Sequence, residues 1–157
     1  MRPAFTMIEL IFVIVVIAIL AGLAVPKMLL IKNDASVTKE LANIEILKND
    51  LSLYYARHSK LPDGLINPIH FTQISNIFWS DNTTIDFKFP KETCIKIKID
   101  NENASITFSP INNPIPLCKT LQFALAKSSL LNLENNTIKD KMISLGGGSI
   151  YNTSNVK

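Results

Sequence analysis

The chain has 157 residues, with 16 basic and 13 acidic side chains and a formal net charge of +3. A balance this close to neutral does not by itself indicate a nucleic-acid partner. The two cysteines do not form a CxxC pair, and the two histidines are too few for a zinc-type cluster. Beyond the N-terminal helix, about 100 residues remain, which is enough for one small domain and excludes a second.

An apolar stretch from Phe5 to Val25 dominates the N-terminal region. No charged side chain occurs from Leu10 to Val25. As a helix that rises about 1.5 Å per residue, the stretch is ~30 Å long and can cross one bilayer. Glu9 is the exception, since a charge inside an apolar helix costs about 2.5–3.5 kcal/mol on insertion scales. We therefore expect a transmembrane helix over residues 5–26, with a functional role for Glu9.

The residues at the start of this helix form a motif. Met1-Arg2-Pro3-Ala4 leads directly into Phe5-Thr6-Met7-Ile8-Glu9-Leu10. This string resembles the class III leader and methylation motif of type IV pilins and type II secretion pseudopilins. The resemblance implies a leader over residues 1–4, cleavage by a prepilin peptidase between Ala4 and Phe5, and N-methylation of Phe5. The family usually has glycine before the cut, where this chain has Ala4. No small-residue cleavage site follows Val25, so removal of the helix as a secretory signal is not expected.

The resemblance gives Glu9 an expected role in assembly. After cleavage, the amine of Phe5 and the carboxylate of Glu9, four residues later, lie on one face of the helix. In a fibre of staggered parallel helices, the carboxylate of one subunit can meet the amine of the next, which sets the register. The alternative is that Glu9 only lies at the membrane interface, with its carboxylate in water.

The resemblance also implies a location and partners. The partners are other pilin or pseudopilin subunits, the prepilin peptidase, an inner-membrane assembly platform and the lipid bilayer. The chain is expected to be a single-pass protein of a bacterial inner membrane with its head in the periplasm, and after assembly to lie in a periplasmic or surface fibre. No cofactor and no metal are expected.

The helix is predicted to continue beyond the membrane. Pro26 removes one backbone hydrogen bond and presses on the carbonyl of Gly22, so the pair predicts a kink or a segment that can melt locally. The alternative is a helix end at Pro26. Against it, residues 27–58 keep an apolar stripe with a period of 3.6 residues, which predicts an amphipathic continuation to about His58. The stripe contains Leu41, Ile44, Leu47 or Lys48, Leu51, Tyr54 and Tyr55, while Lys39, Glu40, Asn43, Asn49 and Asp50 face away.

Residues 59–157 are predicted to form a globular head. Proline and glycine within residues 61–64 end the long helix. Apolar residues at 71, 74, 77 and 78 predict a short helix over residues 71–79. Alternation of apolar and polar residues then predicts three strands, over residues 85–89, 95–99 and 106–108, of which the last two form an antiparallel hairpin. The expected fold class is α+β, a long N-terminal helix packed on a small antiparallel sheet, as in pilins.

The last part of the chain is less regular. A short helix is predicted over residues 117–126 and an exposed polar segment over 132–137, while residues 139–145 fit either a helical turn or a last strand. Gly146-Gly147-Gly148-Ser149 is expected to be a flexible bend, since no Lys-Ser/Thr follows that would make it a phosphate loop. In the oxidising periplasm that the resemblance implies, Cys94 and Cys118 are expected to form a disulfide.

No catalytic constellation is recognisable, so an enzyme is not expected. Three functions stay open: a structural subunit, in minor pilin or pseudopilin form, of a type IV pilus or a type II secretion or competence pseudopilus; a binding module such as a DNA-binding competence pilin or an adhesin; and a stand-alone membrane-anchored domain. Lysines could line one face of the head for DNA, yet carboxylates are interleaved with them, which favours an ordinary solvated face. These lysines are Lys88, Lys96, Lys98 and Lys119, and the carboxylates are Asp86, Glu92 and Asp100.

Overall fold

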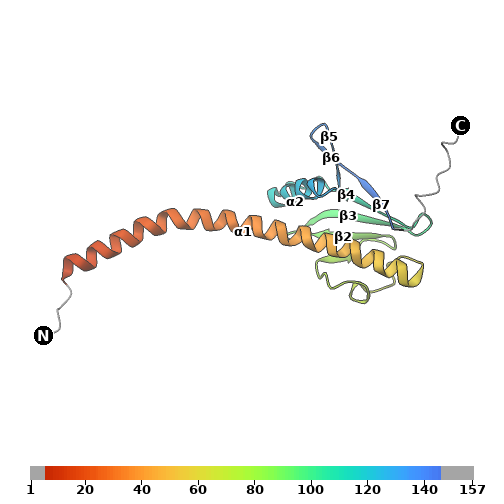
Figure 1. Cartoon of the computed structure of the whole chain (residues 1–157), viewed down its shortest axis with the longest axis horizontal. Coiled ribbons are helices and arrows are strands. Elements are labelled where there is room, and N and C mark those ends of the chain that lie inside the picture. Colours follow the sequence, from red (N-terminus) through yellow and green to blue (C-terminus); the bar gives the residue numbers. More distant parts are fainter. Residues whose placement is uncertain (1–5, 146–157) are drawn as a thin grey trace. The chain divides into compact units, whose positions relative to one another are not determined.

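The structure is a computed structural model that describes residues 6–145, without the side chains of residues 26, 29 and 30 (Figure 1). The chain divides into two compact units, residues 1–36 and 37–157. Its elements in chain order are α1 (Met7–His58), the 3-10 helix η1 (Pro68–His70), β1 (Ile77–Trp79), β2 (Thr84–Lys88), β3 (Thr93–Asp100), β4 (Ser105–Pro110), α2 (Pro116–Lys127), β5 (Asn132–Glu134), β6 (Thr137–Lys139) and β7 (Lys141–Ser144).

α1 is helical over 52 residues and ends at His58, as predicted. The helix assignment continues through Gly22 and Pro26, so the alternative of a helix end at Pro26 is wrong. A Cβ atom added at Gly22 would meet no heavy atom within 4 Å, apart from the adjacent helix backbone. Packing within the chain therefore does not require glycine at this position. The predicted kink at Gly22 and Pro26 stays a prediction.

The second half of α1 belongs to the core of the head. The unit that contains the head begins at Val37, which is buried. Of the predicted stripe, Leu41 is half-buried, and Ile44, Leu47 and Leu51 are 0% exposed. Leu47 rather than Lys48 is thus the core residue at that point of the predicted stripe. Burial of each such side chain contributes about 1.5–3 kcal/mol relative to leaving it in water.

Glu40 departs from the predicted pattern, in which it faces away from the core. Its side chain is half-buried, and its Oε2 accepts hydrogen bonds from Nδ2 of Asn43 and Nδ2 of Asn76, each at 2.9 Å. The Asn76 amide also donates to the carbonyl of Lys88 at 3.0 Å. Glu40 therefore fastens α1 to the segment that enters β1, because a half-buried carboxylate needs donors.

The sheet of the head has five antiparallel strands in the order β1-β2-β3-β4-β7. The three predicted strands are present as β2, β3 and β4, and β3 and β4 form the predicted hairpin. The apolar side chains that alternate along these strands are buried, among them Ile85, Phe87, Ile95, Ile97, Ile106 and Phe108. The chain is thus α+β, with an apolar N-terminal helix and a small antiparallel sheet.

The predicted helix over residues 71–79 is wrong. Residues 71–76 are irregular after η1, and Ile77–Trp79 form β1, which pairs with β2 in the register Ile77↔Phe87, Phe78↔Asp86 and Trp79↔Ile85. Pairing with β2 satisfies the backbone hydrogen-bonding groups on one edge of this segment. The side chain of Ile77 is buried, while that of Phe78 is on the opposite, exposed face. The apolar spacing that suggested a helix is too short to exclude a strand, and the pairing decides between them.

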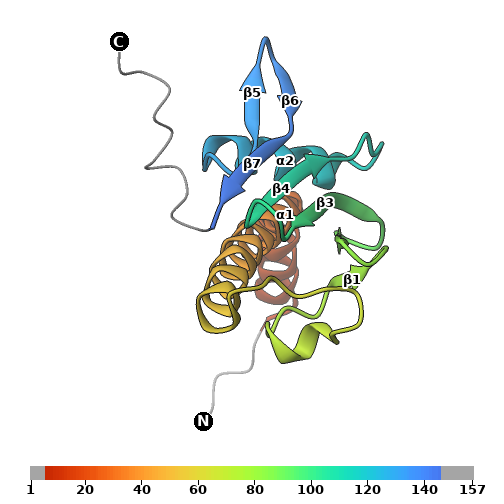
Figure 2. The ribbon, with the colours of Figure 1, turned by 90° about the vertical axis from the view of Figure 1, so that its right-hand side faces the viewer.

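In the C-terminal part, the structure determines the secondary structure of segments for which the sequence left alternatives. α2 confirms the short helix predicted over residues 117–126. Residues 141–144 are strand β7 at the edge of the sheet, so the alternative of a helical turn is wrong. The polar segment 132–137 is largely exposed, but it forms most of a separate hairpin of β5 and β6, which projects from the head in Figure 2. Asn135 and Asn136 both have positive φ, 47° and 63°, as a two-residue hairpin turn requires. The glycine run from Gly146 lies outside the described residues.

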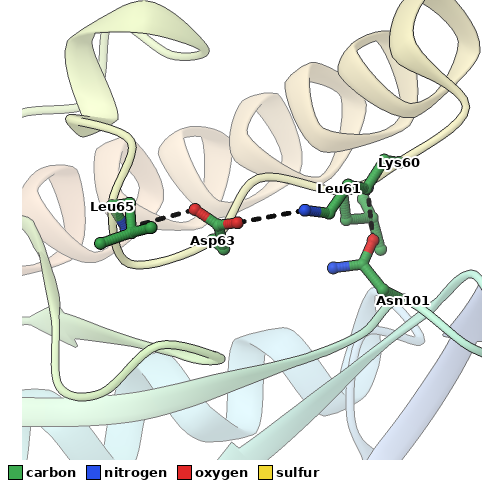
Figure 3. Close-up of polar contacts among 5 residues, drawn as sticks. All are labelled: Lys60, Leu61, Asp63, Leu65 and Asn101. Atoms are coloured by element: carbon green, nitrogen blue, oxygen red, sulfur yellow. Dashed lines mark hydrogen bonds and ion pairs between the residues drawn. The ribbon is translucent and has the colours of Figure 1, made fainter.

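The loop after α1 is fastened to the β3–β4 turn (Figure 3). The backbone N–H of Leu61 donates to Oδ1 of Asn101 at 2.6 Å. Asp63 holds the loop itself, since it accepts from Nζ of Lys60 and from the backbone N–H of Leu65, each at 3.2 Å. Leu61 is fully buried as a result. The predicted turn over residues 61–64 therefore also closes one end of the core.

Candidate functional site

The first half of α1 is an apolar helix that its own chain leaves uncovered. Residues 7–25 are long and apolar enough to cross a membrane, and none of them is buried within the chain. Leu10, Ile17 and Leu23 expose 59%, 58% and 67% of their surface. Apolar surface of this extent is unfavourable in water. By length and composition, the helix can anchor the chain in a bilayer.

Glu9 lies in the first turn of this helix and is held there by Thr6. Its Oε2 accepts hydrogen bonds from the backbone N–H of Thr6 at 2.9 Å and from the Thr6 hydroxyl at 2.8 Å. The Thr6 hydroxyl in turn accepts from the backbone N–H of Glu9 at 3.4 Å. This reciprocal arrangement is a capping box, with Thr6 as the N-cap residue and Glu9 three residues later. The box satisfies the backbone N–H of Thr6, and it gives the N–H of Glu9 a second acceptor beside the Thr6 carbonyl at 3.1 Å.

Thr6 is the residue that the sequence analysis missed. The signal was present, since Thr-x-x-Glu before an apolar run is a helix-start pattern. The structure shows that Glu9 has a partner within its own chain and so does not enter the apolar segment as an isolated carboxylate. It also shows that only Oε2 is used, because no hydrogen bond joins Oε1 to another described residue. A carboxylate oxygen has further lone pairs, so Glu9 can accept a donor from a second chain while Thr6 stays bound.

The remaining predicted residues of the leader motif are Ala4 and Phe5. Both lie outside the described residues, which begin at Thr6. Cleavage between them and methylation of Phe5 therefore stay predictions.

The two cysteines join α2 to the sheet. Cys94 in β3 and Cys118 in α2 form a disulfide with their Cα atoms 5.6 Å apart, and both are 0% exposed. Gln122, one turn further along α2, donates from Nε2 to the carbonyls of Cys94 and Ile111, at 3.0 and 2.8 Å. The disulfide and the Gln122 amide therefore fix one face of α2 to the start of β3, and the amide also holds the proline-containing segment between β4 and α2.

The lysines considered for DNA binding do not form one uninterrupted face. Lys96 and Lys98 are exposed on β3, opposite Asp86 and Thr84 of β2. Lys88 lies over the ring of Phe78, with Nζ 4.4 Å from the centroid. Lys119 lies on α2 and not on the sheet. The structure thus brings three of the four lysines to the outer side of the sheet and places a carboxylate next to them.

Hydrogen bonds lower the pKa of three carboxyl groups in the turns of the head. The side-chain and backbone N–H groups of Asn103 bind Asp100 and hold its pKa below the ordinary value. The backbone N–H of Thr83 has the same effect on the pKa of Asp81, and the ammonium group of Lys139 on that of Glu134. Each bond favours the charged form of the carboxyl group. Asp81 and Glu134 are exposed and Asp100 is half-buried, and each binds a nearby residue of the same turn or hairpin, so these bonds stabilise turns.

Among residues 6–145, no group of three or more His, Cys, Asp and Glu side chains is placed to hold a metal ion. The chemistry that the described residues offer at the N-terminal helix is therefore of two kinds: apolar contact along residues 7–25 and one carboxylate acceptor at Glu9. A comparison of the sequence with models of protein families, with curated proteins and with solved structures finds no match in any of the three.

Proposed function

We propose that the chain is a membrane-anchored, pilin-like subunit, a minor pilin or pseudopilin. After processing by a prepilin peptidase, it assembles into a type IV pilus or a type II secretion or competence pseudopilus. The observation that carries this proposal is the combination at the start of α1: an apolar helix uncovered by its own chain, with one carboxylate fixed in its first turn and the leader motif directly before it.

Two surroundings can cover this helix: a bilayer, or a second helix of the same kind. Each large apolar side chain gains about 1.5–3 kcal/mol on leaving water. A bilayer supplies this gain along residues 7–25, but its hydrocarbon offers Glu9 no partner. A second helix of the same kind supplies both, because its apolar face covers the first helix and its N-terminal amine can meet the Glu9 carboxylate. Transfer from bilayer to fibre therefore keeps the apolar contact and adds an ion pair.

In this proposal the head acts as a structural module in the periplasm, with no catalytic role. Its partners are other pilin-like subunits, the assembly platform and the bilayer. We do not propose DNA binding by the head, because Asp86 lies opposite Lys96 and the ammonium of Lys88 already contacts Phe78. Both arrangements are those of a solvated sheet face.

The proposal is tested by substitution of Glu9→Leu in full-length protein. The variant keeps the apolar helix and removes the carboxylate, so we expect normal membrane insertion. Incorporation into sedimentable fibres should fall at least about tenfold, the factor that a loss of ~1.4 kcal/mol already produces. Crosslinking of sheared fibres measures incorporation, and carbonate extraction of membranes measures insertion.

The matched control is Val13→Leu, a substitution one turn further along the uncovered helix that changes no polar group. It should insert and incorporate like the unmodified protein. Incorporation of Glu9→Leu at the level of Val13→Leu would mean that Glu9 only lies at the membrane interface.

A further inference from the structure

A groove without charge runs beside the outer edge of the sheet. It has a volume of about 390 Å³ and is lined by residues 67–69, 72–75 and 77–79. None of these side chains is charged, and two of them, Ile69 and Phe78, expose 71% and 48% of their surface. We call this feature the β1 groove. The ammonium of Lys88 lies at its border, over the Phe78 ring. Because the lining itself has no charged side chain, it fits an occupant without charges, which loses no ionic hydration on entry.

The backbone of β1 offers unused hydrogen-bonding groups to this groove. Lys88 donates to the carbonyl of Asn76 and Ser80 to that of Thr84, so residues 76, 78 and 80 are the ones whose backbone groups face β2. The N–H and C=O groups of Ile77 and Trp79 therefore point to the outer edge. No backbone hydrogen bond joins either of them to another described residue. Outward groups on alternate residues match the spacing of an added strand.

The sequence contains a segment with the matching chemistry. Residues 146–156 carry no charged side chain and include Ile150, Tyr151, Thr153 and Val156, which favour strands. They follow β7, whereas β1 is at the opposite edge of the five-stranded sheet. Four strand spacings of about 4.8 Å separate the two edges by ~19 Å. A strand added beyond β1 lies one spacing further, at ~24 Å, whereas the chain from Leu145 to Tyr151 spans at most about 22 Å when extended. Ile150 and Tyr151 therefore fall short of that position in the same copy.

We propose that the β1 groove binds the segment around Ile150–Thr153 of a second copy of this chain, as an added strand on β1. The contact joins one edge of a head to the tail at the opposite edge of the next, so it is heterologous and repeats without closing. It rests on the proposed fibre function, for which it names a contact between heads in addition to that between helices.

The test uses synthetic peptides of residues 146–157 with a fluorescent label, titrated with the full-length protein in detergent and followed by anisotropy. The unmodified peptide should bind saturably. Two further peptides carry backbone N-methyl groups, one at Ile150 and Asn152 and the other at Tyr151 and Thr153. In an added strand only one of these sets faces β1, so one peptide should bind at least about tenfold more weakly and the other within about twofold of the unmodified peptide.

The groove side is tested with exposed residues, whose substitution leaves the core intact. Ile69→Ser removes an apolar wall of the groove and should weaken binding of the unmodified peptide several-fold. Leu65→Ser is the matched control, since Leu65 is 89% exposed and does not line the groove, and it should bind as the unmodified protein does. Absence of saturable binding overturns the proposal, and so does binding that is indifferent to the N-methyl position or to Ile69→Ser.

The two proposals fail separately. If no peptide binds while fibre incorporation depends on Glu9, the head contact is wrong and the fibre function stands. If the peptide binds with the expected N-methyl dependence while the chain keeps its leader and forms no fibre, the fibre function is wrong. The contact between heads then stands as a self-association outside a fibre.

Discussion

The two halves of α1 share one helical backbone and have opposite environments. In residues 7–25 no side chain is buried within the chain, and apolar residues point in every direction. In the half that belongs to the head, Ile44, Leu47 and Leu51 are 0% exposed, whereas Ile46 and Leu53 on other faces expose 46% and 50%. A helix apolar all round needs an apolar surrounding, and a helix with one apolar stripe needs one packed face.

This difference shows where each half obtains its stability. The head half packs against a sheet from its own chain, so its contribution can be measured by unfolding one molecule. Among the described residues the N-terminal half has no such partner, and by length and composition it can lie in a bilayer. Substitutions in the two halves should therefore affect different measurements: unfolding for the head half, and insertion and assembly for the N-terminal half.

The largest effect on unfolding is expected for Leu47→Ala. The substitution removes a fully buried side chain and leaves a cavity, which should cost about 2–5 kcal/mol. Urea unfolding of the full chain in detergent, followed by fluorescence of the single tryptophan, Trp79, measures this cost. Ile46→Ala, the adjacent exposed position, and Leu20→Ala, in the N-terminal half, should each change the free energy of unfolding by less than about 0.5 kcal/mol. A comparable loss for Leu20→Ala would remove the distinction between the halves.

The next largest effect on unfolding is expected for the disulfide that joins α2 to β3. Replacement of both Cys94 and Cys118 by alanine should lower the free energy of unfolding by about 3 kcal/mol, because the disulfide spans 24 residues and restricts the unfolded chain. Insertion and fibre incorporation of the N-terminal half should not change at temperatures where the head stays folded. Two reactive thiols on alkylation of protein extracted without reductant would show that the pair is not oxidised in the cell.

A smaller effect is expected at Thr6, at the start of α1. Thr6→Ala removes the hydroxyl from the capping box, which should cost the first turn of α1 about 1 kcal/mol and accelerate amide exchange there roughly fivefold. Thr6→Ser keeps the hydroxyl and should exchange like the unmodified protein. Urea unfolding of the head should be the same in all three. Equal exchange rates in Thr6→Ala and Thr6→Ser would mean that the Thr6 hydroxyl does not hold Glu9.

The smallest effect is a pH dependence confined to the head. The hydrogen bonds from Asn103 lower the pKa of Asp100 in the folded chain, so the unfolded chain binds the proton at higher pH than the folded one. The stabilisation is therefore complete above the unfolded pKa, about 4, and is lost as the pH falls through the folded pKa. The urea concentration at the unfolding midpoint should decrease as the pH is lowered from 5 to about 2. The decrease should be less steep in Asp100→Asn. An identical slope in that variant would assign the pH dependence to other carboxyl groups.

Local patterns were sufficient to predict the regular parts of this chain. The stripe through Ile44 and Leu51 has a helical period, and the strands at Ile85, Ile97 and Phe108 have a period of two, so each could be read without knowledge of its partner. The end of α1 at His58 likewise followed from the nearby proline and glycine. These features depend on neighbours in the sequence.

What the sequence could not show depends on distant pairing. β1 became a strand because β2 is available to pair with it, and Glu40 is half-buried because Asn76, 36 residues later, reaches it. The sequence of the β7 segment fits both a helical turn and a strand, and its pairing with β4 makes it a strand. Thr6 is a different case, because its capping pattern, Thr-x-x-Glu, depends only on neighbours in the sequence.

The proposed function depends most on processing of the chain between Ala4 and Phe5. Mass spectrometry of the N-terminal peptide, from protein extracted from its native membrane, tests this at one bond. We expect a peptide that starts at Phe5 and carries a methyl group on its amine. Uncleaved protein should accumulate when Ala4 is replaced by a bulky residue, and processing of Ala4→Gly should be normal. An N-terminus at Met1 in the mature protein, or a cut near Val25 that removes the helix, would contradict it.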